Sequence, residues 1–203
     1  MKKFFPPLEY VNIPNIATTT GLVSGIVACF FMLQGNMIST IFCLLLATFM
    51  DVIDGFLAKK LKQQTRFGEY MDLLTDFFVC CVVPVLLIYT FVEVSLLTVA
   101  AASFYAVCGL WRLAYFINVT TTEKQPYFTG MPVPGAMLFG IVSIWLYWRL
   151  NAAEIAVPAF APALCFFALG GLMISSVKFK KYGFCQKGLI IFGLAFLAAI
   201  FIF

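Results

Sequence analysis

Long apolar segments follow one another along almost the whole chain, separated by short polar breaks. Each segment is long enough to cross the hydrocarbon of a bilayer, which takes about 20 residues in a helix. Of the 203 residues, 63% are hydrophobic and only 11% are charged, so too few polar side chains exist to cover a water-facing surface. Because a helix satisfies its own backbone hydrogen bonds in lipid, the sequence predicts an all-α, polytopic transmembrane helical bundle.

The segments predict about seven helices, within a range of six to eight. Short alternating segments, which are typical of a transmembrane barrel, do not occur. We expect the whole chain, 1–203, to form a single integral membrane domain, with 1–12 as a short segment at the membrane surface. The expected spans are 14–34, 37–58, 68–92, 94–117, 132–149, 155–177 and 186–203.

The basic residues predict the orientation of these spans. With the seven spans in place, 11 of the 13 Lys and Arg residues fall on one side of the membrane. Arg149 falls on the other side, and Arg112 lies within a span. Basic loops usually face the cytoplasm, so we expect a cytoplasmic N-terminus and a location in the cell (plasma) membrane, in contact with membrane lipids. The net charge of +4 reflects these loops and indicates no nucleic-acid partner.

Four aspartates lie at the facing ends of the second and third expected spans: Asp51, Asp54, Asp72 and Asp76. The first two are three residues apart and the last two are four apart, so each pair shares one helix face. The linker between the spans is short, and the two helices are therefore expected to be antiparallel neighbours. An ionised aspartate in the bilayer costs about 2.5–3.5 kcal/mol. A contribution to stability therefore does not explain the presence of four of them.

Divalent cations would offset this charge, since carboxylate oxygens are the ligands that such ions prefer. The chain has no His, so oxygen ligands are expected. We expect Mg²⁺ or Mn²⁺, as two ions that polarise a phosphodiester for in-line attack. Two other interpretations are solvated carboxylates in the headgroup region and the ion pathway of a transporter. The small residues Gly55, Ala58 and Gly68 favour close approach of a ligand instead.

The order of these residues resembles the signature of the CDP-alcohol phosphotransferases, Asp-x-x-Asp-Gly-x-x-Ala-Arg-x8-Gly-x3-Asp-x3-Asp. This chain departs from it at Lys59, where the family usually has Arg and its planar grip on phosphate. The resemblance implies that the four aspartates ligate the metals and that Asp76 also deprotonates the acceptor hydroxyl. The products would be CMP and a new phosphodiester, and the family usually forms homodimers. The implied donor-binding residues are Asn15, Thr18, Gly55, Ala58, Lys59 and Gly68. Lys178 and Lys180 are further candidates for binding the donor's diphosphate, with an anchor at the cytoplasmic side of the membrane as the alternative.

Further stretches resemble the bacterial and archaeal phosphatidylserine synthases: 13–18, 111–116, 127–134 and 173–179. They imply CDP-diacylglycerol as the donor and L-serine as the acceptor. Gly21 and the segment after Asp76 depart from that group and are expected near the acceptor. The other acceptors that stay open are inositol phosphate, glycerol phosphate and choline.

Arg112 supports serine on physical grounds, because it is the only basic residue deep within a span. A charge in this position needs a partner, and one guanidinium can hold one carboxylate through two hydrogen bonds. A pair with an aspartate or a helix carbonyl is the alternative. Asn118 and Gly130 are the other acceptor-binding candidates.

Overall fold

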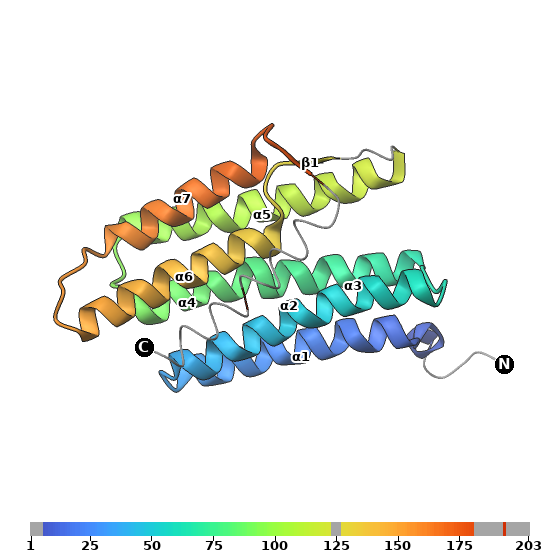
Figure 1. Ribbon diagram of the computed structural model, residues 1–203, viewed down its shortest axis with the longest axis horizontal. Helices are drawn as coiled ribbons and strands as arrows, with labels where there is room; N and C mark the ends of the chain where they lie inside the picture. The colour runs from blue at the N-terminus through green and yellow to red at the C-terminus, as the bar shows by residue number, and fades with distance from the viewer. Residues whose placement is uncertain (1–5, 123–126, 181–192, 194–203) are drawn as a thin grey trace.

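The structure, a computed structural model, describes residues 6–122, 127–180 and 193 of the chain. Helices form nearly all of this part, as long rods that run along the molecule (Figure 1). In chain order, the elements are η1 (Pro6–Tyr10), α1 (Ile13–Leu33), α2 (Met37–Lys60), α3 (Arg66–Asp76), the π-helical turn η2 (Phe77–Val82), α4 (Val83–Phe91), α5 (Leu96–Thr122), β1 (Tyr127–Thr129), α6 (Val133–Ala152), α7 (Phe160–Ile174) and β2 (Lys178–Lys180).

The predicted membrane architecture is confirmed. Five of the described helices are long and apolar enough to cross a membrane, when α3, η2 and α4 are taken as one rod. The sixth expected span, 155–177, is regular only over the 15 residues of α7. Pro158 accounts for the later start, because the residue before a proline avoids helical geometry. The seventh expected span, 186–203, lies outside the described residues apart from position 193.

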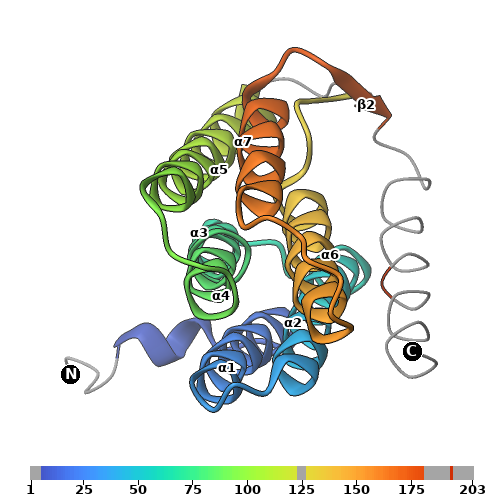
Figure 2. The same cartoon turned by 90° about the vertical axis from the view of Figure 1, so that its left-hand side faces the viewer.

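The helices are stacked as three pairs. α1 packs along α2, the α3–η2–α4 rod lies beside α6, and α5 packs along α7. Figure 2 shows the middle pair between the other two. The α3–η2–α4 rod therefore contacts α1 on one side and α5 on the other. Both neighbours can influence the positions of Asp72 and Asp76, which belong to this rod.

Small side chains let α1 and α2 approach each other closely. A methyl group on Gly21 would lie 3.4 Å from the carbonyl oxygen of Ala47. The hydroxyl of Ser24 donates a hydrogen bond of 2.8 Å to the Cys43 carbonyl. Small residues and interhelical hydroxyl bonds are usual where membrane helices pack. This contact places the first turns of α1 beside the end of α2.

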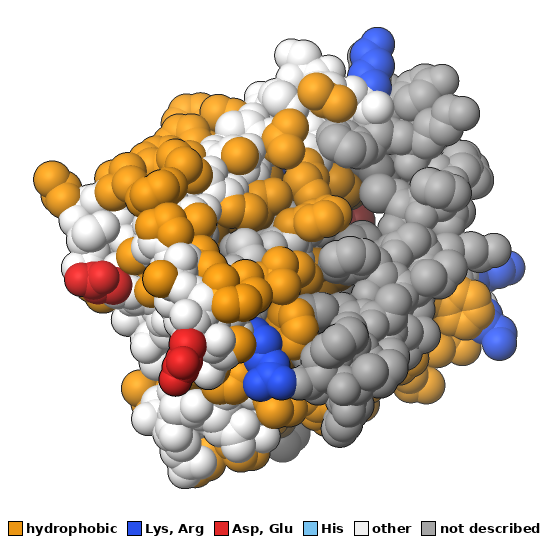
Figure 3. Space-filling model, turned by 60° about the vertical axis from the view of Figure 1, so that its left-hand side comes forward, with side chains coloured by type: hydrophobic (Ala, Val, Ile, Leu, Met, Phe, Trp, Pro, Cys, Tyr) orange, Lys and Arg blue, Asp and Glu red, His pale blue; other side chains and the backbone are white. Residues whose placement is uncertain are grey.

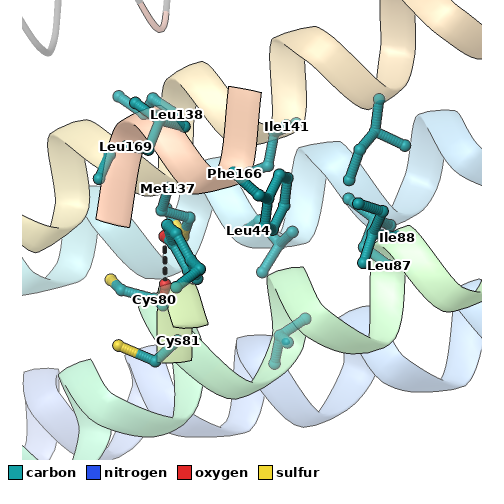
Figure 4. Close-up of a cluster of buried hydrophobic side chains, with 14 of the residues drawn as sticks. Leu44, Cys80, Cys81, Leu87, Ile88, Met137, Leu138, Ile141, Phe166 and Leu169 are labelled. Carbon is teal, nitrogen blue, oxygen red and sulfur yellow. Dashed lines mark hydrogen bonds between the residues drawn. The ribbon is translucent and has the colours of Figure 1, made fainter. Parts of the chain in front are cut away.

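The apolar core lies where the middle pair meets the other two. Leu44 of α2, Ile88 of α4, Ile141 of α6 and Phe166 of α7 are fully buried there (Figure 4). Lipid tails are as apolar as these side chains, so close packing supplies the stabilisation here. A packed centre of this kind fixes the position of α3 relative to α2.

The outward faces of the helices are apolar as well. Leu33 of α1 is 83% exposed and Trp111 of α5 is 71% exposed. Figure 3 shows hydrophobic side chains spread over much of the face displayed, with few charged groups. This exposed apolar cover suits lipid and would be unfavourable in water.

A short sheet joins the turn before α6 to the segment after α7. The apolar pattern did not predict this sheet. β1 pairs antiparallel with β2. Next to it, the Gly130 amide donates a hydrogen bond of 2.8 Å to the Val177 carbonyl. Gly130 has a φ of +79°, and a methyl group there would overlap the Met173 carbonyl oxygen. Both features require glycine at this position.

Candidate active site

α2 and α3 bring three of the predicted aspartates to one point. The two helices are joined by a short turn, and both pack against α1. Asp72 and Asp76 are one helical turn apart on α3, and Asp51 belongs to α2. One carboxylate oxygen from each of these residues lies within 4.8 Å of the others.

Asp54 lies beside this cluster and is anchored to α1. It is the most buried of the four aspartates, with 6% of its surface exposed. The Thr18 hydroxyl donates a hydrogen bond of 2.5 Å to Asp54 Oδ2. Thr18 was expected to bind the donor, and in the structure it holds a carboxylate of the same pocket.

The four aspartates line a pocket between α1, α2 and α3. Hydroxyl and small apolar side chains complete its wall, and none of the lining residues in the described part of the chain is basic. Gly21 and the segment after Asp76, both expected near the acceptor, contribute to it. The lining residues are Thr18, Gly21, Ala47, Thr48, Asp51, Asp54, Asp72, Thr75, Asp76, Val79, Cys80 and Pro134.

The carboxylates of this pocket repel one another. At a separation of 4.8 Å, two ionised groups interact by about 3 kcal/mol at an effective dielectric constant of about 20. Among the described residues, no basic side chain of the wall relieves this repulsion. A bound divalent ion would relieve it, and a set of carboxylate oxygens suits Mg²⁺ or Mn²⁺ better than softer metals. The residues present therefore fit a divalent metal ion.

Two of the expected donor-binding residues meet beside the pocket, where α1 begins. Asn15 is buried and donates from its side-chain amide to the Tyr10 carbonyl at 2.8 Å. A methyl group on Gly68 would lie 2.9 Å from Asn15 Oδ1, so α3 approaches α1 closely at this point. The ring of Tyr10 also stacks on Phe67, with centroids 4.5 Å apart. These contacts fix the first turn of α3 against α1.

The remaining donor-binding candidates face outward. A methyl group on Gly55 would meet no described atom within 4 Å, and Lys59 is exposed one turn further along α2. Ala58 is half-buried between them. Lys178 is exposed on β2, and the side chain of Lys180 lies outside the described part. The surface of α2 around Gly55 is thus open to a ligand.

The acceptor-binding candidates do not line the described pocket. Arg112 is 7% exposed, and its Nε is buried without a hydrogen-bond partner among the described residues. Its guanidinium lies 5.6 Å from the centre of the Phe116 ring. Asn118 is exposed on the same helix, and Gly130 packs against the end of α7.

Tyr105 was not expected near the aspartates, whereas Cys80 belongs to the segment that was expected near the acceptor. Cys80 lines the pocket, and its thiol lies 4.0 Å from Asp76 Oδ1. The Tyr105 hydroxyl reaches across from α5 to the Cys80 carbonyl at 2.8 Å. Pro84, four residues after Cys80, is the signal in the sequence, because it removes the helical donor for that carbonyl.

The bundle and its acidic pocket define a multi-pass membrane protein with a candidate divalent-metal centre. The chain belongs to the CDP-alcohol phosphatidyltransferase family, whose model matches residues 11–170. The membership inferred from the aspartate signature is thereby confirmed, and the chain is a transferase.

Curated relatives cover most of the chain. The CDP-diacylglycerol–serine O-phosphatidyltransferase of Bacillus subtilis is 29% identical, over 84% of this chain and 90% of that protein. The archaetidylserine synthase of Methanothermobacter thermautotrophicus is 29% identical, over 85% of this chain and 71% of that protein. The CDP-diacylglycerol–glycerol-3-phosphate 3-phosphatidyltransferase of Aquifex aeolicus is 36% identical, but over only 32% of this chain and 37% of that protein.

Proposed function

We propose that this protein transfers the phosphatidyl group of CDP-diacylglycerol to the hydroxyl of L-serine, giving phosphatidylserine and CMP. The serine oxygen forms a bond to the phosphorus that carries the diacylglycerol. The bond from that phosphorus to the oxygen of CMP breaks, and CMP leaves. The proton of the serine hydroxyl passes to Asp76, which acts as the general base.

The carboxylates of Asp51, Asp54, Asp72 and Asp76 would hold the metal. When bound, Mg²⁺ or Mn²⁺ would neutralise charge on the phosphate and polarise it for in-line displacement. Thr18 keeps Asp54 oriented through its hydrogen bond to Oδ2. The open face around Gly55 admits the nucleotide, and basic residues such as Lys59, Lys178 and Lys180 attract its diphosphate.

The observation that carries the serine assignment is the buried Nε of Arg112, which has no hydrogen-bond partner among the described residues. A buried cation of this kind requires an anion, and a carboxylate can accept two parallel hydrogen bonds from it. Arg112 lies seven residues after Tyr105 on α5, so both residues share the helix face that looks toward η2. Asn118, further along α5, and Gly130, in the turn before α6, complete the proposed acceptor region. The serine enzymes among the relatives support the same assignment.

Glycerol 3-phosphate is the second candidate acceptor, because the name of the Aquifex relative includes this alcohol and that relative matches part of the chain. An acceptor panel separates the two. Purified protein with CDP-diacylglycerol and Mn²⁺ is given L-serine, glycerol 3-phosphate, inositol phosphate or choline, and CMP and the lipid product are measured. We expect CMP only with L-serine. Release with another alcohol alone would refute serine and leave the reaction class intact.

Ethanolamine provides a sharper test, because it is serine without the carboxylate. If Arg112 holds that carboxylate, Arg112→Gln lowers kcat/KM for serine by about 10- to 100-fold, the value of a charged hydrogen bond. Any slow use of ethanolamine stays unchanged. Arg149→Gln, which removes the charge of an arginine in the last turn of α6, is the matched control. An equal loss with both alcohols would contradict a contact with the carboxylate.

We also propose that the N-terminus and the aspartate ends of α2 and α3 face the cytoplasm, in the plasma membrane, and that the protein is a homodimer. The basic loops support the orientation. An N-terminal epitope that is protected from protease in right-side-out vesicles would agree with it, and an accessible epitope would contradict it. Light scattering of the purified protein measures the oligomeric state.

A further inference from the structure

The rod that carries Asp72 and Asp76 does not continue as a regular α-helix. The next residues, Phe77–Val82, form a π-helical turn in which the Val83 amide donates to the Phe78 carbonyl, five residues back. Such turns inside helices are rare and are frequent at functional sites. This one begins immediately after the aspartate proposed as the base.

Pro84 accounts for the irregular turn. A proline has no backbone N–H, and its ring crowds the carbonyl four residues before it. In this rod, that carbonyl belongs to Cys80. A wider turn relieves the crowding, but the carbonyl still lacks the donor that residue 84 would supply in an α-helix.

Tyr105 of α5 supplies a donor in its place. Its hydroxyl donates a hydrogen bond of 2.8 Å to the Cys80 carbonyl (dashed line in Figure 4). Tyr105 is fully buried, and its ring packs against Phe166 of α7, with centroids 4.9 Å apart. The α5–α7 pair therefore holds this hydroxyl in place. Through the hydroxyl, it also holds a backbone carbonyl of the α3–η2–α4 rod.

Cys80 links this bond to the pocket. Its side chain is part of the pocket wall, and its thiol donates to Asp76 Oδ1 at 4.0 Å. A contact of this length is weak. The covalent link is stronger, because Asp76 and Cys80 belong to neighbouring turns of one helix, so the position of the Cys80 carbonyl affects how both side chains enter the pocket.

We propose that Tyr105 is a positioning residue for Asp76. By holding the Cys80 carbonyl, it keeps the π turn in shape and the Asp76 carboxylate beside Asp51 and Asp72. This inference rests on the proposed function, in which Asp76 takes the proton of the acceptor. Small displacements of a catalytic group reduce the rate strongly, by about 100-fold for 1 Å.

The first test is Tyr105→Phe, which removes only the hydroxyl. We expect kcat to fall about 10-fold, while KM for the donor and for the acceptor changes less than about 2-fold. Tyr89→Phe is the matched control, because Tyr89 is a half-buried tyrosine on α4 of the same rod. A Tyr105→Phe variant with the kcat of the unaltered protein would overturn the proposal.

The second test, Pro84→Ala, is informative even if Tyr105→Phe does not fold. It restores the missing N–H and favours a regular helix, so the unfolding temperature should stay equal or rise. We nevertheless expect kcat to fall at least about 5-fold, because the turn next to Asp76 changes. A more stable variant with unchanged kcat would overturn the positioning role alone. If the unaltered protein released no CMP with any acceptor, the proposed function would fail, and this inference with it.

Discussion

Replacing Gly130 by alanine tests how the structure joins α6 to α7. Gly130 has a φ of +79°, where an L-residue costs about 1–2 kcal/mol. The new methyl group would also overlap the Met173 carbonyl oxygen. Moving the backbone to relieve that overlap costs about 1–3 kcal/mol. It also breaks the hydrogen bond to Val177, for about 1 kcal/mol more.

Gly35 offers a matched control. Its φ is +71°, but a methyl group there would meet nothing within 4 Å in the part of the chain that the structure describes. Gly35→Ala therefore incurs only the backbone cost of about 1–2 kcal/mol. The difference between the two variants isolates the contact with α7, and we expect it to be about 2–4 kcal/mol.

The assay is thermal unfolding in detergent at one heating rate, followed by the tryptophan fluorescence. For a chain of this length, 1 kcal/mol corresponds to about 2–4 °C. Gly130→Ala should therefore unfold at least about 4 °C below Gly35→Ala. Equal midpoints would refute the reasoning. A raised KM for the acceptor without any change in the midpoint would also refute this structural role and leave Gly130 only its proposed role in the acceptor region.

Three further substitutions test the pocket. Thr18→Val removes the hydrogen bond to Asp54, a charged bond worth about 1.5–3 kcal/mol; we expect weaker Mn²⁺ activation, and an unchanged activation constant would contradict the anchoring role. Asp76→Asn keeps the shape of the side chain but removes the base, so CMP release should fall at least about 100-fold while the protein stays folded; activity near that of the unaltered protein would exclude Asp76 as the base. Gly55→Ala fills open space on α2 and should leave the unfolding temperature equal or higher, while KM for CDP-diacylglycerol rises; an unchanged KM would place the nucleotide elsewhere.

The helices and the acidic cluster could be predicted because both depend on local patterns. Apolar length determines the spans, and the spacing of Asp72 and Asp76 places both on one helix face. The short linker to α2 then brings Asp51 to them. The arrangement of the three helix pairs depends on side-chain packing between distant segments, which periodicity does not encode.

The features that sequence reasoning missed depend on contacts between residues far apart in the chain. The Tyr105 hydroxyl reaches a carbonyl 25 residues earlier, and no local pattern specifies that pairing. Pro84 signals an interrupted helix, but does not reveal which group compensates for it. The pairing of β1 with β2 likewise joins two three-residue segments separated by α6 and α7, too short to give an alternating pattern. Donor binding by Asn15 and Thr18 stays a prediction, and their hydrogen bonds to Tyr10 and Asp54 are further long-range or structural contacts that the sequence did not reveal.

Binding of Mn²⁺ tests the acidic cluster most directly, because it requires no assumption about the acceptor. Free Mn²⁺ is measured by electron paramagnetic resonance during titration of the purified protein, of Asp72→Asn and of Glu69→Gln. Glu69 is an exposed carboxylate in the first turn of the same helix and serves as the control. We expect the unaltered protein and Glu69→Gln to bind equally, and Asp72→Asn to bind at least about 10-fold more weakly. Equal binding by all three proteins would contradict a metal centre formed by Asp51, Asp72 and Asp76.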